Sequence, residues 1–453
     1  MRVVSADSET NRLPQTVSKS SSLDTTRSRC AMRCARTSNT CGSTWTTRSP
    51  LRSSYVSVST TVPANLYRIG AECREKAPPS RWAPGLATVT RYMPPLPDRV
   101  LMGPGPCNPY PEAVEALARP MLGHLDPAFV DILDDTCGRL RTIFRTTNAM
   151  TLPISGTGSA GMEAAFVNVV APGDPVVIGV NGVFGARMCD VAGRCGAEVV
   201  RVDVPWGQPV EPDRLVEAHP APRLIAVVHA ETSTGVRSDI APLGAAKGDA
   251  LLLVDCVTSL GGVEVDVDGW GVDIAYAGTQ KCLGVAPGLA PLTLSDRARE
   301  RLVPRSPSWY LDLRMIGRYT GPATGPRVYH HTAPVSMIMS LHAGLGAILD
   351  EGLAAAIARH AECGRLLHDG LADLGLELFA AEGHRLPELT TVLLPPGIDD
   401  AKVRSNLLDR YGIEVGGGLG DYAGRMWRIG CMGHTARPRN VTLLLGALAE
   451  VIG

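Results

Sequence analysis

Short apolar runs recur along the chain from about Leu96, and most of them end in glycine or a polar residue. Such runs, about four to eight residues long and rich in Val, Leu and Ile, are typical of strands buried in a parallel sheet. Helical periodicity fills the intervals between them, at the spacing of β–α–β units. The pattern therefore predicts an α/β fold with a doubly wound, mostly parallel seven-stranded sheet. The expected strands are residues 151–154, 174–180, 199–204, 224–228, 251–255, 274–277 and 289–294.

The pattern changes in the last quarter of the chain. A long Ala- and Leu-rich helical stretch covers residues 336–374, and Gly352 interrupts it, which predicts a bend or a break. We expect residues 93–335 to form a large α/β domain with an N-terminal arm at 93–125, and residues 336–453 to form a smaller α+β domain. Further elements of the smaller domain are expected as strands at 390–394, 413–415 and 426–429 and helices at 400–411 and 440–451.

Residues 1–92 differ from the rest in charge and composition. They hold 14 Lys and Arg against 5 Asp and Glu, a net charge of +9, whereas the remainder holds 30 against 40, a net charge of −10. The first 60 residues contain 24 Ser and Thr, so they cannot bury enough apolar surface to offset the entropy of ordering. We expect a disordered extension or a misassigned start upstream of Met93 or Met102. A transit-like presequence and a basic nucleic-acid arm are the alternatives.

Composition otherwise describes an ordinary globular protein. Hydrophobic residues make up 45% and the net charge is −1, so nothing draws the whole protein to nucleic acid or membrane. No apolar run reaches the ~18 residues of a membrane span. The 12 cysteines contain no C-x-x-C pair, which favours reduced thiols and a cytoplasmic protein. The adjacent His330 and His331 should point in different directions, and no other histidines have metal-binding spacing, so we expect no metal site.

Two of the expected strands end in residues of opposite charge. The run 251–254 is followed by Asp255, and the run 274–277 is followed by Gly-Thr-Gln and then Lys281. Because ligand sites in open α/β sheets lie beyond the carboxyl ends of the strands, both side chains should lie at one edge. An amine and an acid there suit pyridoxal 5′-phosphate (PLP), which needs a Schiff-base lysine and an acid beside its ring nitrogen. On these two residues alone, an ion pair that caps two strand ends fits equally well.

The glycine-rich turn at residues 155–161 follows a strand and opens a helix. The N–H groups and the dipole at a helix start favour phosphate, and Thr157 and Ser159 could add hydroxyl donors. The turn matches neither a P-loop nor a dinucleotide fingerprint, and taken alone such a turn more often binds nothing.

Three other residues at strand ends or within strands are candidates. Phe184, at a strand-to-helix junction, could stack on a flat ring, although an aromatic residue there is more often core. Thr232 ends another strand and could donate a hydrogen bond to a ring hydroxyl. Arg428 lies in an apolar strand, where its guanidinium needs a bidentate partner, either a substrate carboxylate or an acid of the protein.

Together these residues resemble the class V aminotransferases of PLP fold type I, and more narrowly the alanine–glyoxylate, serine–pyruvate and ureidoglycine–glyoxylate aminotransferases. The resemblance runs from about Leu101 to the C-terminus. Each motif is weak alone, but their order and spacing are specific. The motifs are Gly103-Pro104-Gly105-Pro106, Ile154-Ser155-Gly156-Thr157-Gly158, Glu231-Thr232-Ser233-Thr234-Gly235, Val254-Asp255, Gly278-Thr279-Gln280-Lys281, Tyr329-His330-His331-Thr332 and Arg428-Ile429-Gly430.

The resemblance implies a cofactor role for each matching residue. Lys281 matches the Schiff-base lysine, which is also the base of the 1,3-proton shift, and Asp255 matches the partner of the pyridinium nitrogen. Phe184 stands where the family commonly places Trp as ring stacker, and Thr232 matches the partner of the ring hydroxyl. The remaining expected cofactor contacts are Thr157, Gly158, Ser159, Val257 and Gln280.

The resemblance also implies contacts to substrate and to a second subunit. Tyr329 and Thr332 match residues that reach the phosphate of the partner subunit, which implies a homodimer with shared active sites. Arg428 matches the clamp on the substrate carboxylate. Further substrate contacts are expected from Gly105, His124 and Tyr329.

The implied activity is ping-pong transfer of an amino group from alanine or serine to glyoxylate, giving glycine and a 2-oxo acid. The alternative donor is (S)-ureidoglycine, of purine catabolism. The segment Asp126-Pro127-Ala128-Phe129 looks like the ureidoglycine enzymes, but these tend to carry Gln in place of His124 and Asn in place of Tyr329. Two other classes share the fold. They are a desulfurase-like lyase, which would need a mobile Cys363 or Cys431, and a non-catalytic PLP-binding sensor with a basic arm.

Overall fold

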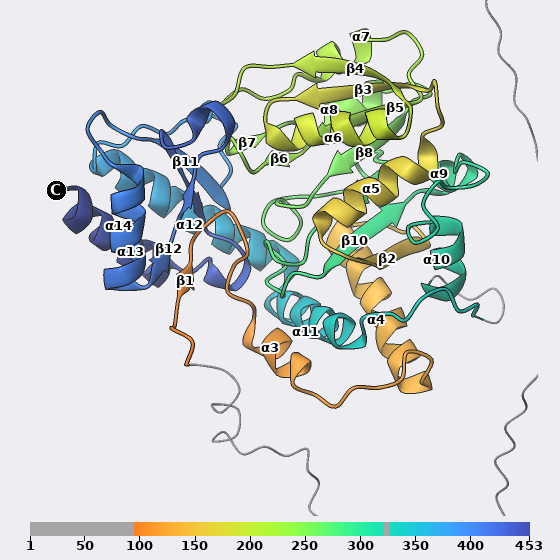
Figure 1. The fold of residues 1–453 in the computed structure, drawn as a ribbon, viewed down its shortest axis with the longest axis horizontal. Helices are drawn as coiled ribbons and strands as arrows, with labels where there is room; N and C mark the ends of the chain where they lie inside the picture. The colour runs from red at the N-terminus through yellow and green to blue at the C-terminus, as the bar shows by residue number, and fades with distance from the viewer. Residues whose placement is uncertain (1–94, 321–326) are drawn as a thin grey trace, which may run out of the picture. The chain divides into compact units, whose positions relative to one another are not determined.

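The computed structural model describes residues 95–320 and 327–453 (Figure 1). The extension expected at residues 1–92 lies outside the described residues. A seven-stranded sheet forms the centre of the fold, and β10 runs antiparallel to both of its neighbours while the other pairs are parallel. The predicted mostly parallel seven-stranded sheet is confirmed. In sheet order its strands are β2 (Met150–Ser155), β10 (Leu289–Leu294), β9 (Ile274–Tyr276), β8 (Leu251–Asp255), β5 (Leu224–Val228), β3 (Pro175–Val180) and β4 (Glu198–Asp203).

Helices pack against this sheet and against each other. Every residue of β5 and β8 is buried, which explains why these strands are continuous apolar runs. Gly185 lets α6 lie directly on β3, because a Cβ there would stand 2.5 Å from the carbonyl oxygen of Gly179. The helices are α3 (Pro111–Leu117), α4 (Pro127–Phe144), α5 (Gly158–Val169), α6 (Val183–Arg194), α7 (Pro212–Glu217), α8 (Ala241–Ala246), α9 (Asp296–Glu300) and α10 (Leu313–Thr320), and the hairpin β6 (Ala230–Glu231) and β7 (Val236–Arg237) follows β5.

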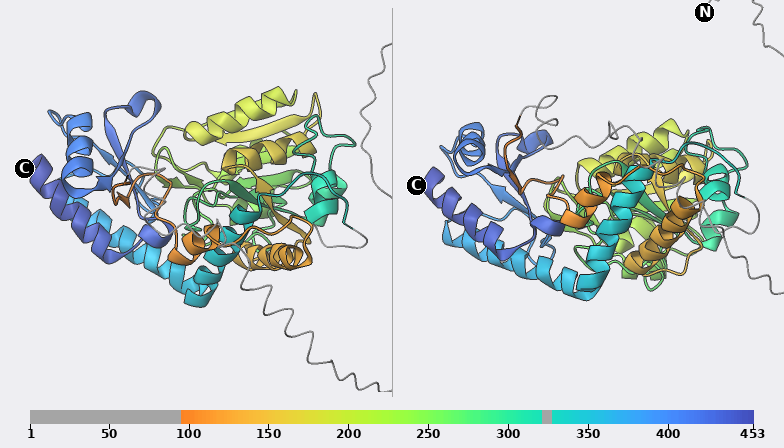
Figure 2. Two further views of the ribbon diagram at one scale, coloured as in Figure 1. Left: turned by 60° about the horizontal axis from the view of Figure 1, so that its bottom comes forward. Right: turned by 90° about the horizontal axis from the view of Figure 1, so that it is seen from below.

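A sharp bend separates the helices α11 (Val335–Glu351) and α12 (Leu353–Asp373). The two helices meet at Gly352, whose φ is +88°, and their axes differ by 84° (Figure 2). The break expected at this glycine is confirmed, and it occurs where an L side chain would be strained. Among the described residues no single helix is long and apolar enough to cross a membrane, and only the bent pair together reaches that length and composition.

A second hydrophobic core surrounds the elements after the bend. It contains a three-stranded antiparallel sheet in the order β11-β14-β13, together with α12, α13 and α14. The N-terminal arm joins this core, since β1 (Val100–Leu101) pairs in parallel with β12 and Met102 is fully buried there. The other elements are β11 (Leu389–Leu393), α13 (Asp400–Tyr411), β12 (Ile413–Glu414), β13 (Gly416–Gly417), β14 (Met426–Gly430) and α14 (Pro438–Ile452).

The two cores do not divide at residue 335. Leu341, Leu345 and Ile348 of α11 pack in the large core, whereas Cys363 and Leu367 of α12 pack in the second one. The expected domain limits therefore stay a prediction, and the packing indicates that the change of core occurs within α12.

Candidate active site

The carboxyl ends of β5, β8 and β9 lie next to one another in the sheet. Asp255 is the last residue of β8 and pairs in register with Tyr276 of β9 and Val228 of β5. Lys281 follows five residues after the end of β9. The strands that lead to Asp255 and Lys281 are therefore neighbours, as expected if the two residues share one edge of the sheet.

Asp255 is buried, with 3% of its surface exposed. Its carboxylate accepts hydrogen bonds from the hydroxyl of Tyr276, at 2.7 Å, and from the backbone N–H of Val257, at 2.8 Å. Burial raises the pKa of Asp255 to about 6, and the two hydrogen bonds oppose that rise. A cationic N–H group beside this buried carboxylate would stabilise its charged form, and a pyridinium ring nitrogen provides such a group.

Lys281 is also buried, and its amine donates a hydrogen bond to the carbonyl oxygen of Pro104. Burial lowers the pKa of Lys281 to about 8, and the charge of Arg428 acts in the same direction. More of the amine is therefore unprotonated near neutral pH, which is the form that reacts with a carbonyl. Gly105 adjoins this side chain, because a Cβ at Gly105 would stand 2.7 Å from Cδ and 2.9 Å from Nζ of Lys281.

The start of α5 lies against the loop that follows Asp255. A Cβ on Gly158 would stand 2.7 Å from Cγ2 of Val257, so only glycine allows this approach. Thr157 is the N-cap of α5 but its side chain makes no capping bond, and the side chain of Ser159 is exposed. Oε1 of Gln280 is buried without a hydrogen-bond partner among the described residues. The uncapped hydroxyl of Thr157 and the N–H groups at the helix start suit an anionic group, and the side chain of Ser159 already accepts from Arg187 at 3.5 Å.

The position of Phe184 is fixed by a buried acid that the sequence reasoning missed. Oε2 of Glu231 accepts hydrogen bonds from the backbone N–H groups of Phe184 and Gly185, at 3.2 and 3.3 Å. Oε1 accepts from the hydroxyl of Ser233 at 2.6 Å, and Ser233 in turn accepts from the N–H of Val183. Glu231 and Ser233 therefore cap α6 from another loop and hold Phe184 at the sheet edge.

The hydroxyl of Thr232 is bonded to the hydroxyl of Thr258 at 2.5 Å, and both side chains are buried. One of the two hydroxyl protons is used in this bond. The other is left for a ligand oxygen, so the pair retains the donor expected of Thr232. Thr258 is a second residue that the sequence reasoning did not single out.

Arg428 lies in the middle of β14, and its Nε donates to the carbonyl oxygen of Gly417 at 2.8 Å. Within the described ranges no carboxylate lies within ion-pair distance of its guanidinium. The Arg428 side chain is half-buried, and this burial lowers its pKa. The structural ion pair considered from the sequence is therefore absent from the described chain, and the side chain can receive an external carboxylate.

His124, Tyr329 and Thr332 form a separate group. The ring of Tyr329 lies 5.4 Å from that of His124, 57% of Tyr329 is exposed, and Thr332 is exposed as well. No hydrogen bond or ring contact in the described part of the chain joins these three residues to Lys281. Their expected roles at cofactor and substrate stay predictions.

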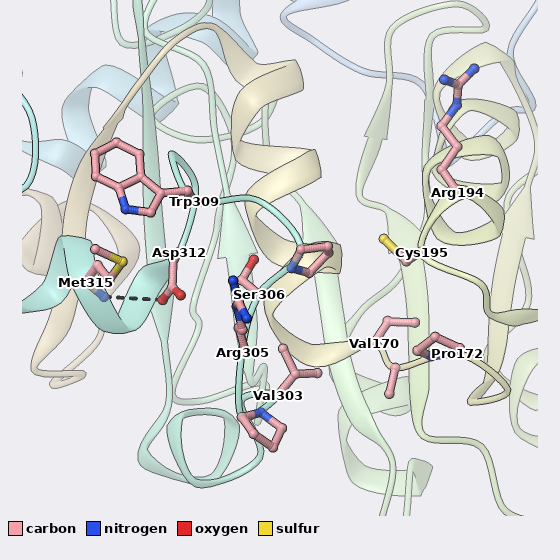
Figure 3. Close-up of a pocket in the computed structure, with 13 residues that line it drawn as sticks. Val170, Pro172, Arg194, Cys195, Val303, Arg305, Ser306, Trp309, Asp312 and Met315 are labelled. Atoms are coloured by element: carbon pink, nitrogen blue, oxygen red, sulfur yellow. Dashed lines mark hydrogen bonds between the residues drawn. The ribbon is translucent and has the colours of Figure 1, made fainter. Parts of the chain in front are cut away.

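The cavity shown in Figure 3 lies elsewhere. Its volume is about 750 Å³, and residues around the turn before β3, the end of α6 and the segment 303–315 line it. None of the predicted site residues is among them. The candidate site is therefore defined by the strand ends rather than by this cavity.

The chain is similar in sequence and structure to proteins of one known family. The sequence model of the family described as aminotransferase class-V matches residues 107–426. An alanine–glyoxylate aminotransferase of Drosophila melanogaster is 39% identical over 367 residues, which are 79% of this chain and 93% of that protein. The crystal structure of an alanine–glyoxylate aminotransferase from Nostoc sp. is 45% identical, with a TM-score of 0.77, and covers 80% of this chain and 97% of its own. That of a ureidoglycine–glyoxylate aminotransferase from Bacillus subtilis is 37% identical, with a TM-score of 0.77, and covers 79% and 94%.

The fold, with a buried lysine and a buried acid at the carboxyl edge of a mostly parallel sheet, is that of the PLP-dependent enzymes of fold type I. The chain belongs to the class-V aminotransferase family. The residues present fit the family's cofactor, PLP, since the structure holds a buried amine, an acid with two fixed donors, an aromatic ring and the start of a helix at one edge of the sheet.

Proposed function

We propose that the protein is a PLP-dependent aminotransferase that moves an amino group from alanine or serine to glyoxylate, giving glycine and a 2-oxo acid. The observation that carries this proposal is the pair of buried groups at neighbouring strand ends, the amine of Lys281 and the carboxyl of Asp255. The family and the named relatives support the same reaction.

Each element of the site has a part in holding the cofactor. Lys281 would hold its aldehyde carbon, Asp255 its ring nitrogen and Phe184 one face of its ring, while the start of α5 and Gln280 would receive its phosphate. When bound, PLP supplies a ring that withdraws electrons from the bonds at the substrate α-carbon. Tyr276 and the N–H of Val257 orient the acid that keeps this ring protonated.

The remaining chemistry belongs to side chains of this protein. The Lys281 amine would take the proton from the substrate α-carbon and return it to the aldehyde carbon of the cofactor, across the nitrogen that links them, so it would act as both base and acid. Its lowered pKa, about 8, suits both directions of that transfer. Arg428 would fix the substrate carboxylate with its two free nitrogens and so present the α-C–H bond to Lys281.

Two kinds of amino donor have support. Tyr329 resembles the alanine–glyoxylate enzymes, and an alanine–glyoxylate enzyme is among the relatives. A ureidoglycine–glyoxylate enzyme is also similar over most of the chain, so (S)-ureidoglycine is the second candidate. A desulfurase-like lyase is disfavoured, because Cys363 and Cys431 are both fully buried and burial raises the pKa of the Cys363 thiol to about 11.

The active unit is proposed to be a homodimer. Tyr329 and Thr332 are exposed on the described chain although their expected role is at a cofactor phosphate. A second copy that covers them would complete its own site with these residues. Sedimentation should give a dimer, and a Lys281→Ala chain mixed with a Tyr329→Ala chain should regain activity through one intact site.

A donor panel tests the reaction. Alanine, serine and (S)-ureidoglycine are each supplied with labelled glyoxylate, and the labelled glycine that forms is measured by mass spectrometry. Cysteine is supplied separately, and the release of sulfide is measured to detect a lyase. Glycine formation that depends on Lys281 supports the proposal. Sulfide without glycine, or neither product with PLP bound, contradicts it.

A further inference from the structure

A chain of hydrogen bonds runs through the two adjacent histidines. The Oγ atom of Ser155 lies 3.0 Å from Nε2 of His331, and Nδ1 of His331 lies 2.8 Å from Nδ1 of His330. Nε2 of His330 lies 3.1 Å from the carbonyl oxygen of Trp309. The rings are nearly perpendicular, at 88°, and their Nε2 atoms reach different partners, while their Nδ1 atoms face each other.

In a neutral pair, the acceptor at the end of this series of hydrogen bonds fixes the direction of each one. A carbonyl oxygen can only accept, so Nε2 of His330 carries a hydrogen and its Nδ1, in the neutral ring, is an acceptor. Nδ1 of His331 must then donate, which leaves Nε2 of a neutral His331 as the acceptor for the hydroxyl of Ser155. The neutral histidines therefore hold opposite tautomers.

Aromatic rings surround the pair and leave it few other partners. Trp309 stacks on His330 with centroids 4.4 Å apart, and the rings of Tyr310 and Tyr319 meet His331 edge-on at 5.2 and 5.9 Å. Together with His124, these tyrosines are the titratable groups that face the pair. Burial lowers the pKa of His331, and the charges of His330 and His124 act in the same direction, which favours the neutral state.

These hydrogen bonds connect the phosphate turn of one site with the segment that would serve the site of the partner copy. Ser155 ends β2 immediately before the turn that leads to Thr157 and the start of α5. His331 lies between Tyr329 and Thr332, which are exposed. A bond between Ser155 and His331 therefore sets the distance between the segment 329–332 and the turn at a strand end.

We propose that Ser155, His331 and His330 are positioning residues that hold the segment 329–332 against the end of β2 through opposite neutral tautomers, so that Tyr329 and Thr332 are presented to the site of the partner copy. This inference rests on the proposed function for the use of that placement, but not for the hydrogen bonds themselves. A proton added to one ring still leaves an acceptor at the Nδ1 of the other, whereas protons on both rings make both Nδ1 atoms donors and break the bond between them.

Histidine tautomers give a readout that needs no cofactor. With ¹⁵N-labelled histidine in the full chain, long-range ¹H–¹⁵N spectra at pH 8 should show Nε2–H for His330 and Nδ1–H for His331, each assigned by its loss in a His330→Gln or His331→Gln variant. The same tautomer in both rings, or a charged ring at pH 8, overturns the proposal whether or not the protein binds PLP.

Cofactor affinity tests this placement. Loss of one neutral hydrogen bond should weaken PLP binding by Ser155→Ala roughly 2- to 12-fold at pH 8, whereas Ser155→Thr keeps the hydroxyl and should match the wild type. A deficit shared by Ser155→Thr, or no deficit in Ser155→Ala, contradicts the proposal. Absence of PLP binding in the wild type would refute the proposed function and leave the tautomer result to decide the hydrogen-bond chain.

Discussion

The phenol of Tyr276 donates a 2.7 Å hydrogen bond to Oδ2 of Asp255, and the two residues are register partners on β9 and β8. Both are fully buried, so the bond is shielded from water. The position of the Asp255 carboxylate is therefore set by the sheet itself, through a pair of strands and one hydroxyl.

Tyr276→Phe should weaken the binding of PLP to the apoprotein. Without the phenol the carboxylate loses one of its two donors, so the pKa of Asp255 rises further above its value of about 6. Since the charged form binds the ring nitrogen, affinity in the wild type should fall as pH falls through about 6, and the variant should lose affinity at higher pH. We expect roughly 10-fold weaker binding at pH 7, measured by fluorescence titration, from the loss of a bond to a charged group.

Tyr422→Phe, far from Asp255 in the sequence and stacked on Trp206, is the control and should bind PLP normally. An unchanged pH profile in Tyr276→Phe would show that the phenol does not tune the acid.

Gly105→Ala should lose bound cofactor while the protein stays folded. The added Cβ would stand within 2.9 Å of the Lys281 amine, and φ at Gly105 is +109°, a region that costs an L residue about 1–2 kcal/mol. Gly103→Ala is the matched control, because a Cβ there meets nothing closer than 3.6 Å. The absorbance of bound PLP and the melting temperature are measured on both. Equal PLP content in the two variants would mean that Lys281 is not confined by the arm.

Arg428→Lys should impair substrate binding and leave the cofactor in place. The ammonium keeps the charge but loses the fork that binds a carboxylate, so kcat/KM should fall for donor and acceptor alike. Losing such a pair in a desolvated site costs about 2–5 kcal/mol, or roughly 30- to 5,000-fold in kcat/KM. Arg425→Lys, exposed just before β14, should behave as the wild type. A variant that loses PLP but handles substrates normally would remove Arg428 from the substrate site.

Glu388→Gln should stabilise the protein, and more so at higher pH. Both carboxyl oxygens of Glu388 are buried without a partner among the described residues, and burial raises its pKa to about 8. The folded state then keeps a proton that the unfolded state releases above pH 4.5, so wild-type stability falls as pH rises from 4.5 to 8 and is level above that. The neutral amide does not lose stability in this way, so the advantage of the variant should grow to about 4 kcal/mol by pH 8.

Melting temperatures between pH 5 and 8 check this prediction for Glu388. The exposed Glu382→Gln is the control and should show no such trend. An offset between Glu388→Gln and the wild type that does not change with pH would mean that burial does not raise the pKa of Glu388.

The sheet and the pair at its edge could be predicted because both depend on local pattern. Apolar runs that end in Asp255 or in the turn before Lys281 identify buried strands and their carboxyl ends without knowledge of the partners. Phe184 was located for the same reason, at a strand-to-helix junction. The break at Gly352 followed from one glycine in an otherwise helical stretch.

The parts that the sequence did not reveal depend on contacts between distant segments. Glu231 looks like any polar loop residue until α6 is packed against it, 47 residues away in the chain from Phe184. The pairing of β1 with β12 joins Val100 to Ile413, and two-residue strands leave no periodic pattern. In the sequence Tyr276 is one residue of an apolar run, and the acceptor of its hydroxyl is known only when its neighbour on β8 is known.

The most direct test of the central claim, that Lys281 is the residue that holds PLP, is borohydride reduction of the loaded protein followed by peptide mass spectrometry. Lys281 lies at the sheet edge, buried and with a lowered pKa, next to the strand that carries Asp255. We predict a yellow protein whose colour is lost on reduction and whose pyridoxyl mass is found on the peptide that contains Lys281. The label on another lysine, or no label in a protein that carries out the transfer, would contradict the account.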